Sequence, residues 1–283
     1  MQKRTWLIRL AAPVTAPAGL LLAVLTGVCV AQAAAAQTAS DVAANPGRPT
    51  VSTPATLTPV GYLQFENGPT QAWRSPEFTF QMNFNETVKL AVSQRLQLLA
   101  VTEPMARSKA QGRLATDAGG VALGGQAVLH AGESARPTIA VSYLRQVYGG
   151  TAPDLDMGSP TDAVTVLASA DVRGFHYDAN ALINRLKQDS VSRAQWALTL
   201  SISHAITKRV SWSGELWHFT QPFLHGRAVG NLWALAYAER PNLVWDGGFN
   251  RGLTGTSTQW EVFAGFTYLL PHRLWRRSGK SAD

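Results

Sequence analysis

The feature that most constrains this chain is a stretch in which apolar and polar residues alternate one for one. Residues 78–85 read Phe-Thr-Phe-Gln-Met-Asn-Phe-Asn. Because successive side chains of a strand point to opposite faces, this segment has one apolar and one polar face. Residues 174–182 repeat the design, with Phe175 and Tyr177 opposite His176 and Asp178. An aromatic face backed by an imidazole and a carboxylate suits a membrane barrel, which has lipid outside and water inside.

The first 36 residues have the pattern of an export signal. Basic residues near the N-terminus precede an apolar stretch at 18–33, and Ala34–Ala36 supply small residues for a cleavage site. A retained membrane anchor is the alternative, but the polar residues at 37–40 favour cleavage. The single cysteine, Cys29, falls inside this signal, so no disulfide is expected beyond it.

Composition after the signal excludes two classes of protein. No stretch approaches the roughly 18 continuous apolar residues of a membrane helix, which leaves a soluble periplasmic β-protein or an outer-membrane barrel. The net charge of +7 includes three cations of the signal and a basic tail from Pro271 onward. The body is therefore close to neutral and has no basic stripe, so nucleic acid is excluded as a partner.

The chain divides into four parts: a signal peptide at 1–36, a flexible periplasmic linker at 37–58, a barrel at 59–270 and a basic tail at 271–283. The linker is assigned because it is rich in Ala, Thr, Ser and Pro and has almost no bulky apolar side chain. Twelve strands are expected in the barrel, at 59–66, 77–91, 96–103, 118–129, 136–147, 162–169, 174–184, 194–203, 208–219, 230–239, 242–250 and 258–268.

The links between these strands alternate between short and long. An even strand count, short turns on one rim and longer loops on the other are typical of bacterial outer-membrane barrels. The sequence therefore predicts an all-β chain, a single transmembrane antiparallel barrel with short periplasmic turns and longer extracellular loops. Localisation in the cell outer membrane and contact with its lipid follow from this fold.

Period-two parity also assigns the two faces of the wall. Trp196 and Trp260 near the long loops, and Trp212, Trp245 and Tyr268 near the short turns, have the parity of the apolar face and predict two aromatic girdles. The residues expected to contact lipid are Phe78, Phe80, Met82, Phe84, Phe175, Tyr177, Trp196, Leu198 and Leu200.

The opposite parity collects the polar residues expected to face the lumen. They are Glu77, Gln81, Asn83, Gln126, Gln146, His176, Asp178, Asn180, Glu215, Asp246, Asn250 and Glu261. Two interpretations stay open: the residues line a water-filled passage, or they form a network that plugs a narrow barrel. Twelve strands lie between the filled eight-stranded barrel and the open channel of about sixteen strands, so strand number does not decide.

No catalytic residue, metal ligand or cofactor site is predicted. His176 and Asp178 lie about 7 Å apart along a strand, too far for a direct hydrogen bond in extended geometry, and no further ligand lies in register for a metal. The serines at 201–213 lie near His204 and His218, as a lipid-acting enzyme would require. No Gly-x-Ser-x-Gly elbow accompanies them, so an enzyme is disfavoured.

Three segments carry a resemblance to a known family: residues 84–92, residues 204–216 and the closing stretch 245–268. With these motifs the chain resembles the outer-membrane barrel family named for the meta-pathway of phenol degradation. The resemblance implies an outer-membrane transporter that passes small, including hydrophobic, molecules. The leading functional hypothesis is passive, weakly selective passage of a small solute that the sequence does not name. A plugged structural or surface-binding barrel and a lipid-acting envelope enzyme are the alternatives.

Overall fold

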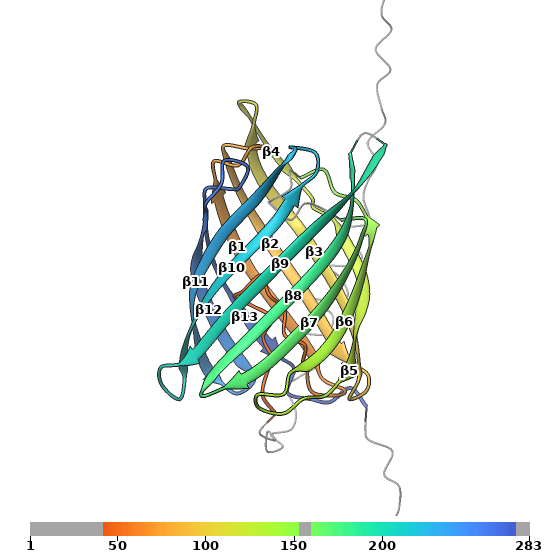
Figure 1. The fold of residues 1–283 in the computed structure, drawn as a ribbon, viewed down its shortest axis with the longest axis vertical. Helices are drawn as coiled ribbons and strands as arrows, with labels where there is room; N and C mark the ends of the chain where they lie inside the picture. Colours follow the sequence, from red (N-terminus) through yellow and green to blue (C-terminus); the bar gives the residue numbers. More distant parts are fainter. Residues whose placement is uncertain (1–41, 153–159, 189, 276–283) are drawn as a thin grey trace, which may run out of the picture. The chain divides into compact units, whose positions relative to one another are not determined.

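The protein is an all-β barrel, described here from a computed structural model over residues 42–152, 160–188 and 190–275 (Figure 1). These residues belong to one compact unit, Asp41–Asp283, and the expected signal peptide lies outside them. The strands are β1 (Leu63–Trp73), β2 (Phe80–Ala91), β3 (Leu96–Ala110), β4 (Arg113–Asp117), β5 (Val121–His130), β6 (Thr138–Tyr148), β7 (Asp162–Val172), β8 (Phe175–Gln188), β9 (Val191–Ala205), β10 (Val210–Gln221), β11 (Gly226–Arg240), β12 (Leu243–Gly252) and β13 (Trp260–Leu269).

Twelve of these strands form a closed antiparallel wall, as the sequence predicts. Each strand pairs with its neighbour in the chain, and β1 pairs with β13 to close the ring. The short β4 pairs only with the loop-side end of β3, and β5 pairs with the rest of the same edge of β3. The ring therefore has twelve strands and not thirteen. Because the ring is closed, each of its twelve strands has a neighbour on both sides. A barrel in lipid needs this closure to satisfy its backbone hydrogen bonds. No helix among the described residues is long and apolar enough to cross a membrane.

Several strands extend further than the sequence analysis expected. Strand β1 starts at Leu63 rather than residue 59 and continues through Gly68 and Pro69 to Trp73. Pro69 has no N–H, and the β1–β13 pairing is interrupted at these two residues while its register is kept. Part of the expected loop 104–117 is likewise a hairpin of β3 and β4. Near the rims both faces of a strand are in contact with water, so apolar and polar residues no longer alternate there. The ends of the strands therefore cannot be predicted from the alternation.

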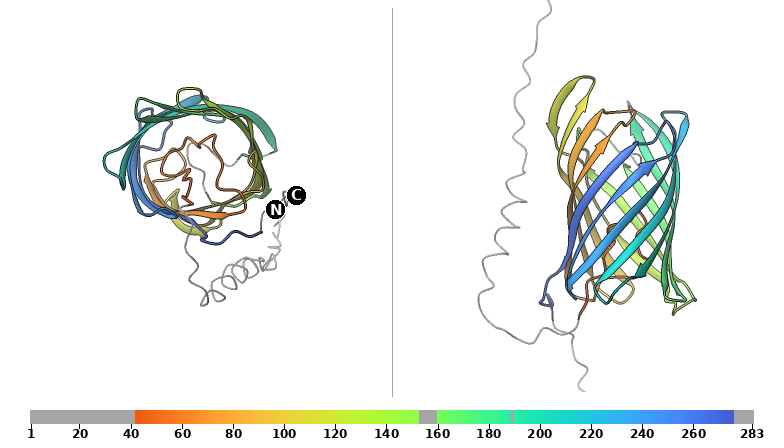
Figure 2. Two further views of the ribbon diagram at one scale, coloured as in Figure 1. Left: turned by 90° about the horizontal axis from the view of Figure 1, so that it is seen from below. Right: turned by 90° about the vertical axis from the view of Figure 1, so that its left-hand side faces the viewer.

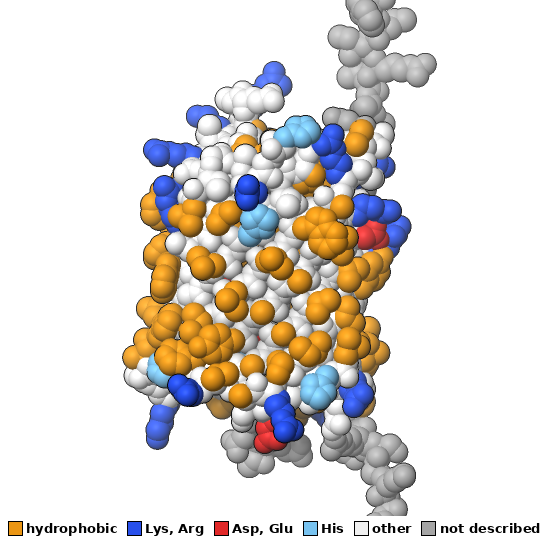
Figure 3. All heavy atoms as spheres, viewed as in Figure 1, with side chains coloured by type: hydrophobic (Ala, Val, Ile, Leu, Met, Phe, Trp, Pro, Cys, Tyr) orange, Lys and Arg blue, Asp and Glu red, His pale blue; other side chains and the backbone are white. Residues whose placement is uncertain are grey.

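Apolar side chains cover much of the outer face of the wall (Figure 3), and the side chains buried on the inner face are mostly polar. Leu198, for example, is 61% exposed on β9, whereas its neighbour Thr199 is 4% exposed. Trp196, Trp245 and Trp260 are likewise exposed on the outside. Exposed apolar side chains around a buried polar interior are the reverse of a soluble protein and fit a wall surrounded by lipid.

One residue expected to contact lipid lies elsewhere. Phe80 and Met82 lie on the outer face of β2, but Phe78 belongs to the loop before this strand and is 3% exposed. The strand begins two residues later than the alternation suggests, so period-two parity does not apply to Phe78.

Residues 42–58 lie inside the ring of strands, where the sequence analysis expected a flexible linker outside the barrel. Seen along the barrel, this segment winds through the lumen (Figure 2). Ser52 and Ala55 are completely buried. The described part of the expected linker is therefore a packed insert, which we call the lumen segment.

Candidate functional site

Apolar side chains of the lumen segment occupy two small hydrophobic clusters on the inner wall. Ala55 packs into a cluster that contains Val128 and Leu167. Val51 packs against another cluster, which contains Trp217 and Phe219. These contacts place the segment across the lumen from β5–β7 to β10.

Glu215 on β10 binds the backbone of the lumen segment at two successive residues. One carboxylate oxygen accepts hydrogen bonds from the N–H and the hydroxyl of Ser52, both at 2.6 Å, and the other accepts the N–H of Val51 at 2.7 Å. Glu215 is only 4% exposed. Since hydrogen bonds to a carboxylate are stronger than those between neutral groups, Glu215 holds Val51 and Ser52 tightly against the wall.

Neutral amides of the wall hold the next residues. The side-chain amide of Asn180 accepts a hydrogen bond from the N–H of Thr53 at 2.6 Å and donates one to the carbonyl of Thr53 at 2.9 Å. Asn180 thus makes the two backbone hydrogen bonds that a neighbouring strand would make. Gln126 donates to the carbonyls of Pro54 and Ala55 at 3.0 and 3.1 Å. These bonds satisfy backbone groups of Thr53, Pro54 and Ala55.

Two further wall residues complete this attachment. The hydroxyl of Ser169, which donates to Asp178, accepts the N–H of Ala55 at 2.7 Å. Gln97 accepts the N–H of Thr58 at 2.9 Å just before the chain enters β1. The wall thus binds the segment along its length.

A charged pair fixes the centre of the segment. Arg48 donates to both carboxylate oxygens of Asp246, from Nη2 at 3.0 Å and from Nε at 3.2 Å, and also to the carbonyl of Ala264. The side chain of Asp246 is 2% exposed and that of Arg48 17%. A two-point guanidinium–carboxylate contact sets the orientation of Arg48 as well as its position.

A second ion pair lies next to it. Glu66 on β1 pairs with Lys89 on β2, and both side chains are almost fully buried. Glu66 also accepts the N–H of Gly47 at 2.9 Å and a hydrogen bond from Gln64 at 2.8 Å. The lumen therefore contains two ion pairs, in addition to the carboxylate of Glu215, which is bound by N–H and hydroxyl donors.

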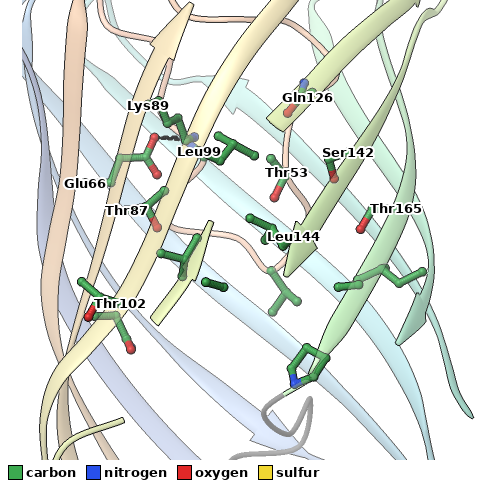
Figure 4. Close-up of a pocket in the computed structure, with 18 of the residues that line it drawn as sticks. Thr53, Glu66, Thr87, Lys89, Leu99, Thr102, Gln126, Ser142, Leu144 and Thr165 are labelled. Carbon is green, nitrogen blue, oxygen red and sulfur yellow. Dashed lines mark hydrogen bonds and ion pairs between the residues drawn. The ribbon is translucent and has the colours of Figure 1, made fainter. Parts of the chain in front are cut away.

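The described part of the chain has a cavity on each side of the segment. The loop-side cavity, about 480 Å³, lies between the segment and β2–β8 (Figure 4). Its wall combines hydroxyls and amides with aliphatic side chains such as Leu99 and Leu144. The turn-side cavity, about 340 Å³, is lined by His176, Ser203 and residues of the short turn at 206–209.

The lumen segment lies between these two cavities. Arg48 and Thr50 line both of them. Val51 and Thr53 face the loop side, whereas Pro46 and Pro49 face the turn side. Among the described residues, 46–53 therefore lie between the two cavities and line both of them.

Most of the polar residues that parity assigned to the lumen lie on the inner face of the wall. Four of them, Gln126, Asn180, Glu215 and Asp246, hold the lumen segment. Gln81, Asn83, Asp178 and Asn250 are buried, and Gln146, His176 and Glu261 are partly buried. Glu77 differs from the expectation, because it is an exposed residue of the β1–β2 loop, before the strand begins.

His176 differs from the expected geometry. Its Nε2 lies 3.2 Å from Asp178 Oδ1 and its Nδ1 2.8 Å from Asp171, the residue opposite on β7. The expectation that Asp178 is out of reach was wrong, because side chains lean along a strand and shorten the separation of their tips. Both ring nitrogens of His176 therefore lie next to carboxylates.

Sequence reasoning missed the wall residues Lys89, Trp217 and Phe219 as well as the lumen segment. Lys89 has the same parity as Gln81 on β2 and could have been assigned by extending the alternation. Nothing in the composition of residues 42–58 marks them as an insert. Within the described ranges, no group of three or more His, Cys, Asp or Glu is arranged to hold a metal ion.

Comparisons with known proteins support the fold. No protein-family model and no curated protein matches the chain. Among solved structures, an outer-membrane channel from Pseudomonas putida F1 is 11% identical with a TM-score of 0.55, over 76% of this chain and 98% of that chain. The NanC porin is 10% identical with a TM-score of 0.51, over 73% of this chain and 98% of that chain. The chain therefore has the fold of an outer-membrane β-barrel.

Proposed function

We propose that this protein is a passive channel of the outer membrane for small, uncharged solutes. The observation that carries the proposal is the pair of cavities on the two sides of residues 46–53. One cavity lies on the loop side of the lumen and the other on the turn side, with residues 46–53 between them. A solute that enters from the loops continues to the turn side when this segment is displaced.

The lining of the loop-side cavity supports a solute that is both apolar and hydrogen-bonding. Thr87, Thr102 and Ser142 present hydroxyls beside the aliphatic side chains of Leu99 and Leu144 (Figure 4). The ion pairs Arg48–Asp246 and Glu66–Lys89 each offset a carboxylate with a cation beside this cavity, so these four side chains add little net field there. A solute of this class is compatible with the resemblance to barrels named for phenol degradation.

A plugged structural barrel is the second candidate, and one observation favours it. Wall residues on five or more strands bond the lumen segment, which is a dense attachment for an element that must move. The lipid-acting enzyme is disfavoured because His204 and His218 have the outward parity of Leu200 and Leu216, whereas the nearby serines have the inward parity of Thr199 and Glu215.

Swelling of vesicles that contain the full chain separates these candidates. Vesicles are placed in glycerol or in benzyl alcohol, both small and uncharged, and in potassium gluconate of equal osmolarity. The channel is supported by rapid swelling in the uncharged solutes and slow swelling in the salt. A plugged barrel gives swelling no faster than empty vesicles in every solute, and release of fatty acid from the vesicle lipid would indicate the enzyme.

A further inference from the structure

A row of charged side chains crosses three strands on the outer wall near the long loops. Arg145 on β6, Asp162 on β7 and Arg185 on β8 are direct cross-strand neighbours. Asp162 pairs with Arg145 at 2.9 Å and with Arg185 at 2.5 Å. The side chains of the two arginines are 61% and 55% exposed, so most of their surface faces outward.

Asp162 holds this row in place without neutralising it. One carboxylate is shared by two guanidiniums, each with five N–H donors, so donors remain on both arginines for a further anion. The Tyr143 hydroxyl also donates to Asp162, at 2.7 Å. Lys187 lies two residues beyond Arg185 on the same face of β8 and adds another exposed cation. The group therefore has a fixed geometry and an excess of positive charge.

Apolar side chains lie below this group on the same face. Val164 and Val166 on β7 and Ile183 on β8 are exposed by 38%, 50% and 38%. Cationic donors above and an apolar surface below match the two parts of a phosphorylated lipid. A free phosphate ion would use only the upper part.

The same order recurs around the barrel. In Figure 3, Lys and Arg side chains lie at both rims, above and below the apolar band. At the loop-side strand ends of the described chain, the cations with outward parity are Arg107, Lys109, Arg145, Arg185, Lys187, Arg227 and Arg251. The acid with that parity at these strand ends, within the described residues, is Asp162.

We propose that Arg145, Arg185 and Lys187 bind a phosphate group of lipopolysaccharide in the outer leaflet. Arginine binds phosphate through two parallel hydrogen bonds, and a nearby lysine adds charge. The proposal rests on the barrel spanning the outer membrane with its long loops outward. It does not depend on passage of a solute, because the site lies on the outside of the wall.

Binding of lipid A to the folded full chain in detergent tests the proposal by native mass spectrometry. Lipid A with its phosphates is compared with the same lipid after phosphatase treatment, with phosphatidylglycerol and with inorganic phosphate. The variant is Arg145→Gln/Arg185→Gln/Lys187→Gln. The matched control, Lys208→Gln/Arg209→Gln/Arg240→Gln, removes three exposed cations from the opposite rim.

The variant is expected to bind phosphorylated lipid A at least about tenfold more weakly, while the control binds like the parent. A heat-modifiability gel shows whether the triple variant is folded. If it is not, Lys187→Glu is used instead, because it leaves the pairs with Asp162 intact, and it must also weaken binding. Equal loss in variant and control, or unchanged affinity after phosphatase treatment, overturns the site. Equally tight binding of phosphatidylglycerol or of inorganic phosphate overturns the assignment to lipopolysaccharide. Vesicle swelling is measured separately, so a failed channel and a failed lipid site are told apart.

Discussion

Glu215 and Ser52 are joined by two hydrogen bonds of 2.6 Å, across 163 positions of the chain. With the bond from Val51, one wall carboxylate fixes two consecutive peptide units of the lumen segment. This arrangement resembles the binding of a peptide more than the packing of a core, because side chains of the wall take the place of a neighbouring strand. The width of the lumen therefore depends on how firmly a few side chains hold residues 46–58.

Glu215→Gln is expected to loosen the segment without opening the wall. A glutamine offers one acceptor oxygen and turns an N–H₂ toward the donors of Val51 and Ser52. The free energy that holds the segment against the wall should fall by about 1–3 kcal/mol. Hydrogen exchange at Val51 and Ser52 measures it and should become faster. Glu239→Gln, at an exposed carboxylate near the short turns, is the control, and equal exchange in all three proteins would contradict the role of Glu215.

Arg48→Met is expected to destabilise the protein more than replacement of both partners. The single change leaves the Asp246 carboxylate, 2% exposed, without its cation, which costs about 3 kcal/mol or more. Arg48→Met/Asp246→Leu removes both charges and should recover much of this loss. Urea unfolding in lipid vesicles, followed by tryptophan fluorescence, gives the free energies. If the double variant is as unstable as the single one, the pair is not the reason for the loss.

Leu198→Arg is expected to hinder insertion of the barrel. Leu198 is 61% exposed on the outer face of β9, and an arginine there costs roughly 2–4 kcal/mol near the middle of the bilayer. Thr79→Arg is the control, because Thr79 precedes β2 and is exposed at the loop side. The fraction folded into vesicles, read from heat-modifiable migration, should fall only for Leu198→Arg. A greater loss for Thr79→Arg would contradict the facing of the wall.

Period-two alternation predicted the wall because lipid and water impose opposite demands on adjacent residues. Gln81 and Leu198 could be assigned to opposite faces from parity alone, whereas Phe78 could not, since the strand begins only at Phe80. The lumen segment was beyond such reasoning. Its Ser, Thr and Pro residues resemble a linker, and its place depends on acceptors such as Glu215 that lie far along the chain. Local composition carries no record of partners at that distance.

Removal of residues 42–58 tests what the segment contributes to the lumen. It deletes Arg48, and the carboxylates of Asp246 and Glu215 lose their partners while they stay on the wall. Conductance in planar bilayers should rise several-fold, since the constriction between the two cavities is gone.

The truncated barrel should also select cations over anions, because unpaired carboxylates attract cations into a narrow lumen. Reversal potentials across a gradient of potassium chloride measure this preference. Asp246→Asn/Glu215→Gln in the truncated barrel should reduce it, and Glu239→Gln, at the exposed rim, should not. An unchanged preference after both lumen carboxylates are neutralised would mean that ions cross by a path other than the one beside β10 and β12.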